Sequence, residues 1–151
     1  LQQGKKVSLM PMAEHVNSMG QALTSKRLVG APRAIDFSTS KGRAFPEASA
    51  AHQLERRGVD AALIVKGEAL EELPPTAMEA LTKIPTIVLE ESATQVFSKA
   101  RVSVPLSVMG VESGGVVARM DGVEVELKPF LKPPGGVTDE EVFLEKLLSM
   151  L

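Results

Sequence analysis

The stretch Val59-Asp60-Ala61-Ala62-Leu63-Ile64-Val65-Lys66-Gly67-Glu68 decides the fold of this chain. Residues 61–65 form an unbroken apolar run, and Gly67 closes it. Such a short run without polar alternation is typical of a strand buried on both faces, as in a parallel sheet. Helical patterns end before this stretch and begin again after it. In such a sheet ligands bind where the chain leaves the carboxyl end of a strand, which here is the turn of residues 66–68.

Strand and helix patterns alternate on both sides of this stretch. Helices are predicted at residues 13–23, 46–57, 73–83 and 92–100, and strands at residues 6–10, 34–37, 85–89 and 102–105. This alternation indicates an α/β fold with right-handed crossovers. We therefore predict a Rossmann-like, open and mostly parallel sheet with helices on both faces.

The pattern changes in the last third of the chain. Asp121-Gly122 between alternating apolar residues predicts a β-hairpin over about residues 115–128. Residues 138–141 read as a capping box, and apolar residues at helical spacing follow it. We predict an α/β domain at 1–128, a linker at 129–137 and a helix at 138–151 that docks on the domain.

The composition excludes several classes of function. The chain has 151 residues, a formal net charge of −2, no Cys, no Trp and no Tyr. Nucleic-acid binding and membrane insertion are therefore not expected, because there is no basic excess, no base-stacking Trp or Tyr, and no apolar run near the roughly 20 residues of a membrane span. The absence of Cys fits a cytoplasmic protein and removes thiolate metal sites. The chain starts at Leu1 and not at Met, which is compatible with a processed, a tag-cleaved or an excised product that lacks upstream residues.

The segment after the first predicted strand is a candidate anion site. Asn17 and Gly20 fall where a strand passes into a helix, and His15 lies near the first turn. Backbone N–H groups at such a turn suit a phosphate or a pterin-like group. A plain strand-to-helix turn explains the same residues and is the commoner outcome for short motifs.

Five collinear segments together resemble one known family, the B subunits of formylmethanofuran dehydrogenase, which are members of the molybdopterin oxidoreductases. The run Arg119-Met120-Asp121-Gly122-Val123 is the most specific of the matches. The resemblance extends in order from about Lys6 to Lys128. The matching segments are residues 11–20 (PMAEHVNSMG), 34–38 (AIDFS), 58–65 (GVDAALIV), 100–105 (ARVSVP) and 110–123 (GVESGGVVARMDGV).

The resemblance implies a cofactor and a reaction. Members of this family hold molybdenum or tungsten on molybdopterin guanine dinucleotide and reduce carbon dioxide to formylmethanofuran, a reaction of archaeal methanogenesis. By resemblance this chain matches the α/β domain that holds part of that cofactor. Other subunits of such a complex are the implied partners, and self-association stays an open alternative. The implied cofactor contacts are His15, Asn17, Gly20, Lys66, Gly67, Glu68, Glu112, Gly114 and Gly115.

The chain also differs from that family's pattern. Lys66-Gly67-Glu68-Ala69 replaces a Ser-Asp-Pro or Glu-Asn-Pro turn, and Gly115-Val116 replaces a Gly-Thr pair. Three hypotheses follow: a cofactor-binding part of an oxidoreductase, a stand-alone non-catalytic relative that acts as a cofactor-binding or protein-interaction module, and an unrelated flavodoxin-like or Rossmann-like domain. We assign no catalytic residue and no metal ligand to this chain.

We expect the purified chain alone to oxidise neither formate nor formylmethanofuran. It has no Cys to ligate a metal or a cluster, and it shows no Ser-His-Asp set and no Walker loop. A dye-linked assay of the isolated chain checks this expectation, and turnover there would contradict it.

Overall fold

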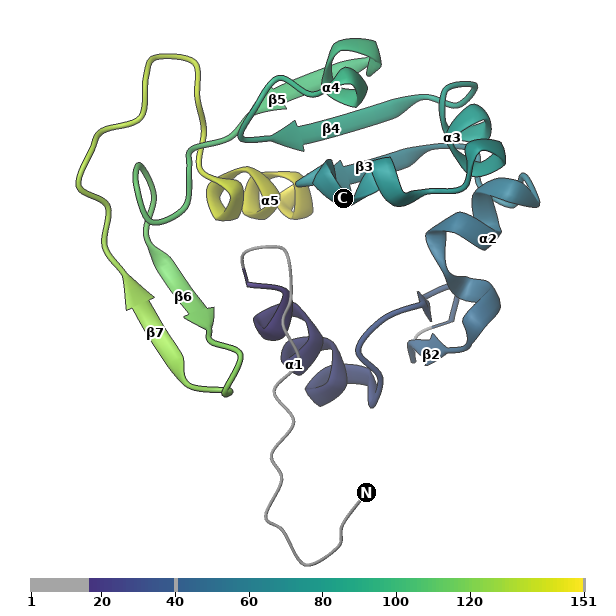
Figure 1. The fold of residues 1–151 in the computed structure, drawn as a ribbon, viewed down its shortest axis with the longest axis horizontal. Helices are drawn as coiled ribbons and strands as arrows, with labels where there is room; N and C mark the ends of the chain where they lie inside the picture. Colours follow the sequence, from purple (N-terminus) through teal and green to yellow (C-terminus); the bar gives the residue numbers. More distant parts are fainter. Residues whose placement is uncertain (1–16, 40, 151) are drawn as a thin grey trace, which may run out of the picture.

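The computed structural model describes residues 17–39 and 41–150. The predicted strand at residues 6–10 and the candidate residue His15 lie outside these ranges. The described residues form a mixed α/β structure with a three-stranded parallel sheet, two antiparallel hairpins and a C-terminal helix (Figure 1). The predicted α/β fold class is confirmed. Among the described residues no helix is long and apolar enough to cross a membrane.

The central sheet has the strand order β3-β4-β5, with both neighbouring pairs parallel. Its strands are β3 (Ala62–Val65), β4 (Thr86–Glu90) and β5 (Val102–Pro105). Ile64 stands opposite Val88, and Val88 stands opposite Ser103. β4 has a partner on each side, and its residues Val88 and Leu89 are fully buried. The sheet is thus organised around β4 as well as around the β3 stretch that predicted it.

Two crossovers connect these strands. The 3-10 helix η2 (Gly67–Glu72) and α3 (Pro75–Leu81) lead from β3 to β4, and α4 (Gln95–Lys99) leads from β4 to β5. Pro75 suits the first turn of α3, where a missing N–H costs nothing. The Thr94 side chain caps α4 by accepting a hydrogen bond from Phe97 N at 3.2 Å. Because parallel crossovers are right-handed and both run the same way across the sheet, both helices cover the same face.

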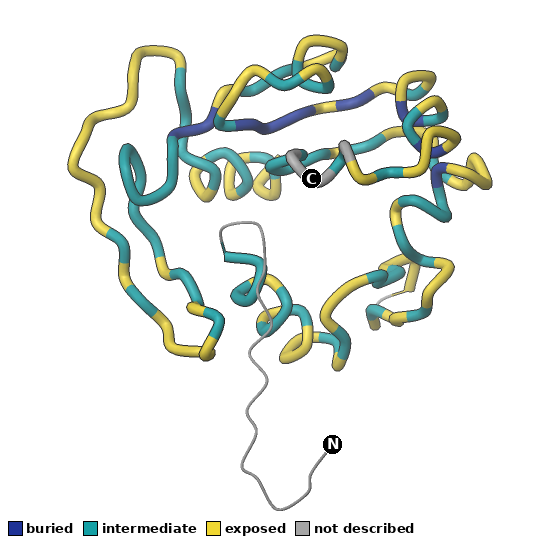
Figure 2. The backbone as a smooth tube through the Cα atoms, viewed as in Figure 1, coloured by how far each residue is buried: buried dark blue, intermediate teal, exposed yellow. Residues whose placement is uncertain are grey.

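The helix predicted at residues 46–57 is divided in two. The 3-10 helix η1 (Pro46–Ala48) comes first, and α2 (Ala50–Glu55) follows. Ser49 separates them in an extended conformation, because its side chain accepts from His52 N at 3.4 Å and so caps α2. Leu54 of α2 forms a buried cluster with Ala77 and Leu81 of α3. Figure 2 shows the buried segments along β4 and where α2 meets α3.

The second face of the sheet is only partly covered. Leu63, Ile87 and Val102 are adjacent in register across the three strands, and they are 46%, 36% and 47% exposed. Toward the carboxyl ends of the strands the same face is closed, since Leu89 is fully buried. The amino-terminal half of this face therefore lacks a covering layer among the described residues.

The remaining elements lie outside the central sheet. They are α1 (Ser18–Val29), the hairpin of β1 (Ile35–Asp36) with β2 (Arg43–Ala44), the hairpin of β6 (Gly115–Ala118) with β7 (Glu124–Leu127), and α5 (Glu140–Ser149). Gly122 takes a φ of 82° in the β6–β7 turn, as the Asp-Gly motif predicted. Asp139 caps α5, one residue later than the predicted Thr138, since its side chain accepts from Glu141 N and Val142 N. The division into a domain, a linker and a docking helix stays a prediction.

We expect Leu89→Ala to lower the free energy of unfolding by about 2–5 kcal/mol, because it leaves a cavity under the central strand. Leu148→Ala on α5 is the matched control, since Leu148 is 71% exposed and its truncation changes stability by less than about 0.5 kcal/mol. Urea unfolding of both variants measures the difference. Equal losses in the two variants would contradict the burial of β4.

Candidate functional site

A pocket of about 360 Å³ lies at the carboxyl edge of the sheet. We call it the carboxyl-edge pocket. It is lined by Lys66 after β3, by Ser107 and residues 113–116 after β5, and by one side of α5. Of the candidate residues it brings together Lys66, Gly114 and Gly115. Their convergence follows from the topology, since parallel strands end at the same edge of a sheet.

Lys66 joins three parts of the chain at this pocket. Its Nζ lies 2.8 Å from Glu91 Oε1 after β4 and 3.1 Å from Glu140 Oε2 at the start of α5. Partial burial of the ammonium group lowers the pKa of Lys66, but the hydrogen bonds and charges of the two carboxylates raise it by more. The net pKa lies above the ordinary value of 10.5. Lys66 is therefore a charged, doubly paired residue at working pH.

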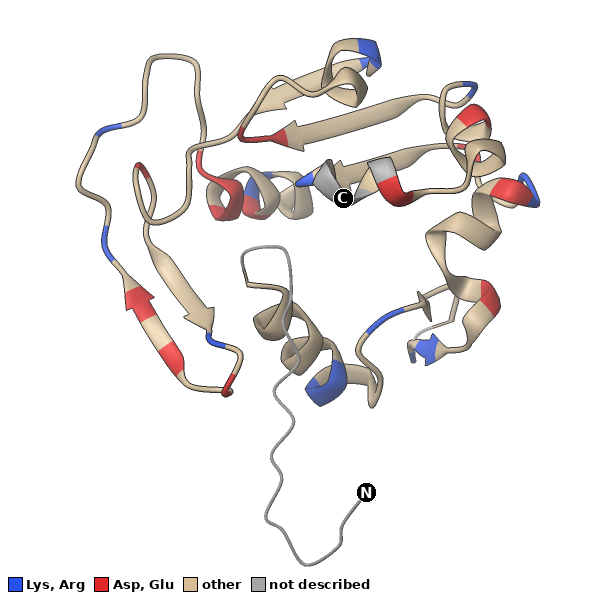
Figure 3. Cartoon of the chain, viewed as in Figure 1, with Lys and Arg blue, Asp and Glu red and all other residues tan. Residues whose placement is uncertain are grey.

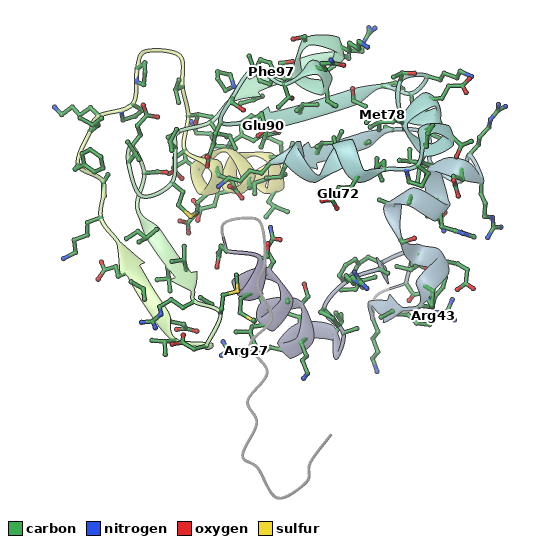
Figure 4. All side chains as sticks on the ribbon, in the orientation of Figure 1. Arg27, Arg43, Glu72, Met78, Glu90 and Phe97 are labelled. Atoms are coloured by element: carbon green, nitrogen blue, oxygen red, sulfur yellow. The ribbon has the colours of Figure 1, made fainter. Side chains whose placement is uncertain are left out.

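The acidic pair after β4 holds the neighbouring turns. Glu90 is only 2% exposed, and its Oε2 accepts a hydrogen bond from Gly67 N at 2.7 Å. Glu91 Oε1 accepts from Met109 N at 3.4 Å. Figure 4 labels Glu90 at the carboxyl end of β4. Sequence reasoning assigned no role to these residues. The sequence does contain a signal for these contacts, because two carboxylates follow one strand and a lysine follows the neighbouring strand.

The glycine-rich loop is shaped by contacts within the chain. Glu112 Oε2 accepts from Val108 N at 3.0 Å, so this carboxylate closes its own loop. A Cβ on Gly114 would lie 2.8 Å from Leu127 O, so the approach of β7 requires glycine there. Gly115 has a φ of 145°, which L-residues rarely adopt. Of the three candidates in this loop, only Gly114 and Gly115 line the carboxyl-edge pocket.

The other candidate residues lie apart from the carboxyl-edge pocket or are not described. Asn17 Oδ1 accepts from Ala118 N of β6 at 3.0 Å, and a Cβ on Gly20 would collide with the Asn17 side chain. These two residues therefore fasten α1 to β6. Gly67 lines a different cavity, on the face covered by α3 and α4. His15 and the side chain of Glu68 lie outside what the structure describes.

The chemistry of the pocket favours hydrogen-bond donors over phosphate. Of the described residues that line it, four are acidic and only Lys66 is basic, and Lys66 is already paired twice. Ser107 is 3% exposed, and its Oγ has no hydrogen-bond partner among the residues that the structure describes. Within the described part of the chain no three His, Asp or Glu side chains are grouped to hold a metal. The lining thus fits the N–H edge of a heterocycle such as guanine or pterin, and it does not fit a pyrophosphate.

We expect Lys66→Met to lower the free energy of unfolding at pH 7–9 by about 1–2 kcal/mol, between the values for exposed and buried ion pairs. Because the folded-state pKa of Lys66 is raised, this contribution is present below the unfolded pKa and disappears as pH rises above about 10.5. Chemical unfolding of the wild type and the variant from pH 7 to 11 measures it, with Lys132→Met as the surface control. A difference that stays constant up to pH 11 would contradict the assignment.

Two curated proteins match nearly the whole chain. One is the B subunit of the tungsten-containing formylmethanofuran dehydrogenase 2 of Methanocaldococcus jannaschii, which is 33% identical over 147 residues. The other is the protein of the same name from Methanococcus maripaludis, 29% identical over 145 residues. Each match covers 95% of this chain and 33% of the relative. The chain thus spans about a third of the length of the curated relatives it matches.

A solved structure shows the same fold. It is a chain of the formyltransferase/hydrolase complex from Methylorubrum extorquens, determined with methylofuran. It superposes with a TM-score of 0.67 at 22% identity and covers 92% of this chain and 39% of that one. No protein-family model matches the chain. On the two sequence matches, the chain is homologous to a segment of the B subunit of formylmethanofuran dehydrogenase.

Proposed function

We propose that this chain forms one wall of the pterin-cofactor site in a protein related to the B subunit of formylmethanofuran dehydrogenase. The observation that carries the proposal is the carboxyl-edge pocket, where Lys66, Gly114 and Gly115 meet a buried, unpartnered Ser107 hydroxyl. An unpaired buried hydroxyl costs free energy that a bound polar group recovers. The tungsten-containing relatives support the cofactor class, and the convergence of these residues supports the pocket as its location.

The pocket residues suit one part of the cofactor and not another. Glu141, Glu145 and Ser107 present acceptor oxygens, which suit the N–H groups of a guanine or pterin edge. The pyrophosphate belongs outside the pocket, because four carboxylates repel it and Lys66 is neutralised by Glu91 and Glu140. When bound, the molybdenum or tungsten cofactor supplies the electron transfer between carbon dioxide and the formyl group. This chain's residues bind and orient one end of it.

The rest of the active site belongs to other segments or subunits in this proposal. The curated relatives are about three times as long as the matched segment, and the solved structure is of a multi-subunit complex. A cytoplasmic assembly with such partners is the setting we propose for the chain.

A second candidate function is a non-redox role in a formyl-transfer complex. Two observations favour it. Lys66 and Glu112 are both engaged in contacts within the chain, and the chain of the formyltransferase/hydrolase complex shares this fold. In that case the carboxyl edge is a structural support or a contact surface for neighbouring subunits, and no pterin is retained.

Metal and pterin analysis distinguishes the two candidates. The protein is purified from its source with partners retained, and tungsten, molybdenum and guanine-containing pterin are quantified. Stoichiometric metal and pterin support the cofactor role. An intact complex that contains neither contradicts it and supports the second candidate.

We expect Ser107→Ala to leave the free chain as stable as the wild type or up to about 1 kcal/mol more stable, because it removes an unpaired buried hydroxyl. The same variant should retain less pterin in the purified complex. Ser98→Ala on exposed α4 is the matched control and should change neither measurement. A Ser107→Ala chain that is clearly destabilised, with unchanged pterin content, would show that the hydroxyl is structural.

A further inference from the structure

A second, larger cavity lies on the face of the sheet that α3 and α4 cover, and it has a volume of about 720 Å³. We call it the amino-edge cavity. It exists because the covering helices are short. Five residues in α4 and seven in α3 extend about 7 and 10 Å, whereas the five residues of β4 extend about 16 Å. The helices therefore leave a gap over the beginning of β4. The volume of the cavity lies within the usual range for small-molecule sites.

The walls of this cavity combine apolar side chains with the polar residues Thr82, Thr94 and Gln95. Its apolar lining includes Met78 of α3, Ile84 in the connection to β4 and Val96 of α4, and Figure 4 labels Met78 on α3. Thr86, which is 7% exposed, lies at its base on β4. An apolar ligand body of moderate size would bury its surface against these side chains.

The rim of the cavity carries basic residues. Lys83 follows α3, Lys99 ends α4, and Arg101 precedes β5. These places lie at one edge of the sheet, because each crossover helix ends where the next parallel strand begins. Basic residues appear at the end of α4 and in the turn before β4 in Figure 3. Among the described lining residues none is acidic.

Two of these cations have no ion-pair partner among the described residues. Lys83 pairs with Glu79 at 2.5 Å, but neither Lys99 nor Arg101 forms an ion pair with a described residue. A partly apolar cavity whose rim carries these two cations attracts a ligand that has an apolar body and a single anionic head.

From this arrangement we propose that the amino-edge cavity binds an amphipathic anion, with its one carboxylate or phosphate head between Lys99 and Arg101 and its apolar body against Met78, Ile84 and Val96. The cavity shares no lining residue with the carboxyl-edge pocket, and most of its lining residues precede β4 or β5, although Gly67 brings one side of it to the end of β3. The inference is therefore independent of the proposed cofactor role, and the failure of either leaves the other standing.

The test is an NMR titration of the ¹⁵N-labelled 151-residue chain with octanoate, octyl phosphate and the neutral analogue 1-octanol. We expect saturable shifts of the Ile84 and Val96 amides with at least one anion, and binding of 1-octanol about tenfold weaker because it lacks the charge. Whichever anion binds more tightly identifies the head group. Absence of saturation at millimolar concentrations of both anions, or equal affinity for 1-octanol, would overturn the proposal.

Paired variants locate the head group. Lys99→Gln/Arg101→Gln should weaken anion binding about tenfold and leave 1-octanol unaffected. Lys128→Gln/Lys132→Gln removes the same charge from the exposed stretch after β7 and should leave anion binding unchanged. All four substituted side chains belong to exposed residues, so folding is retained and is checked in the same spectra. Equal weakening by the two double variants would show a general charge effect and overturn the site.

Discussion

The ammonium group of Lys66 joins the end of β3 to two other segments, and the carboxyl edge of the sheet depends on this interaction. Glu91 comes from the end of β4 and Glu140 from the start of α5, and both reach Lys66 at the end of β3. Glu90 adds a second connection from β4 to the same turn through Gly67 N. Without these contacts α5 would be held less firmly at this edge, because none of its residues is fully buried.

The parallel sheet and its crossovers could be predicted from the sequence because local patterns specify them. The apolar run at residues 61–65, the Asp121-Gly122 turn and the apolar repeat of the last helix each depend on neighbouring residues. Helix starts were less predictable, since Ser49 and Asp139 compete with other residues as caps. A cap depends on a side-chain rotamer, which a sequence pattern does not specify.

The candidate site was predictable only in part, for a related reason. Topology brings Lys66, Gly114 and Gly115 to one edge, and a strand order is enough to anticipate that. The hydrogen-bond partners of the polar side chains, by contrast, depend on the tertiary structure. Asn17 reaches Ala118, Glu112 closes its own loop, and Ser107 is left unpaired, yet in the sequence all three look like ordinary polar residues in loops. Polar residues at such turns hold the fold together as readily as they bind a ligand.

The two edges of the sheet differ in charge, although the chain as a whole carries only −2. Acidic residues gather at the carboxyl edge, and Lys83, Lys99 and Arg101 gather at the amino edge. This separation gives the domain an electrical polarity along its strands. Each edge therefore attracts a different class of ligand, and the overall charge hides both preferences.

The row formed by Leu63, Ile87 and Val102 has a practical consequence for work with the chain by itself. These three side chains make a hydrophobic strip across all three strands, on the sheet face opposite α3 and α4. Exposed strips of this kind promote self-association and aggregation. The isolated chain should accordingly self-associate more as its concentration rises. A single charged replacement at Ile87, in the middle of the strip, is the simplest way to reduce this self-association.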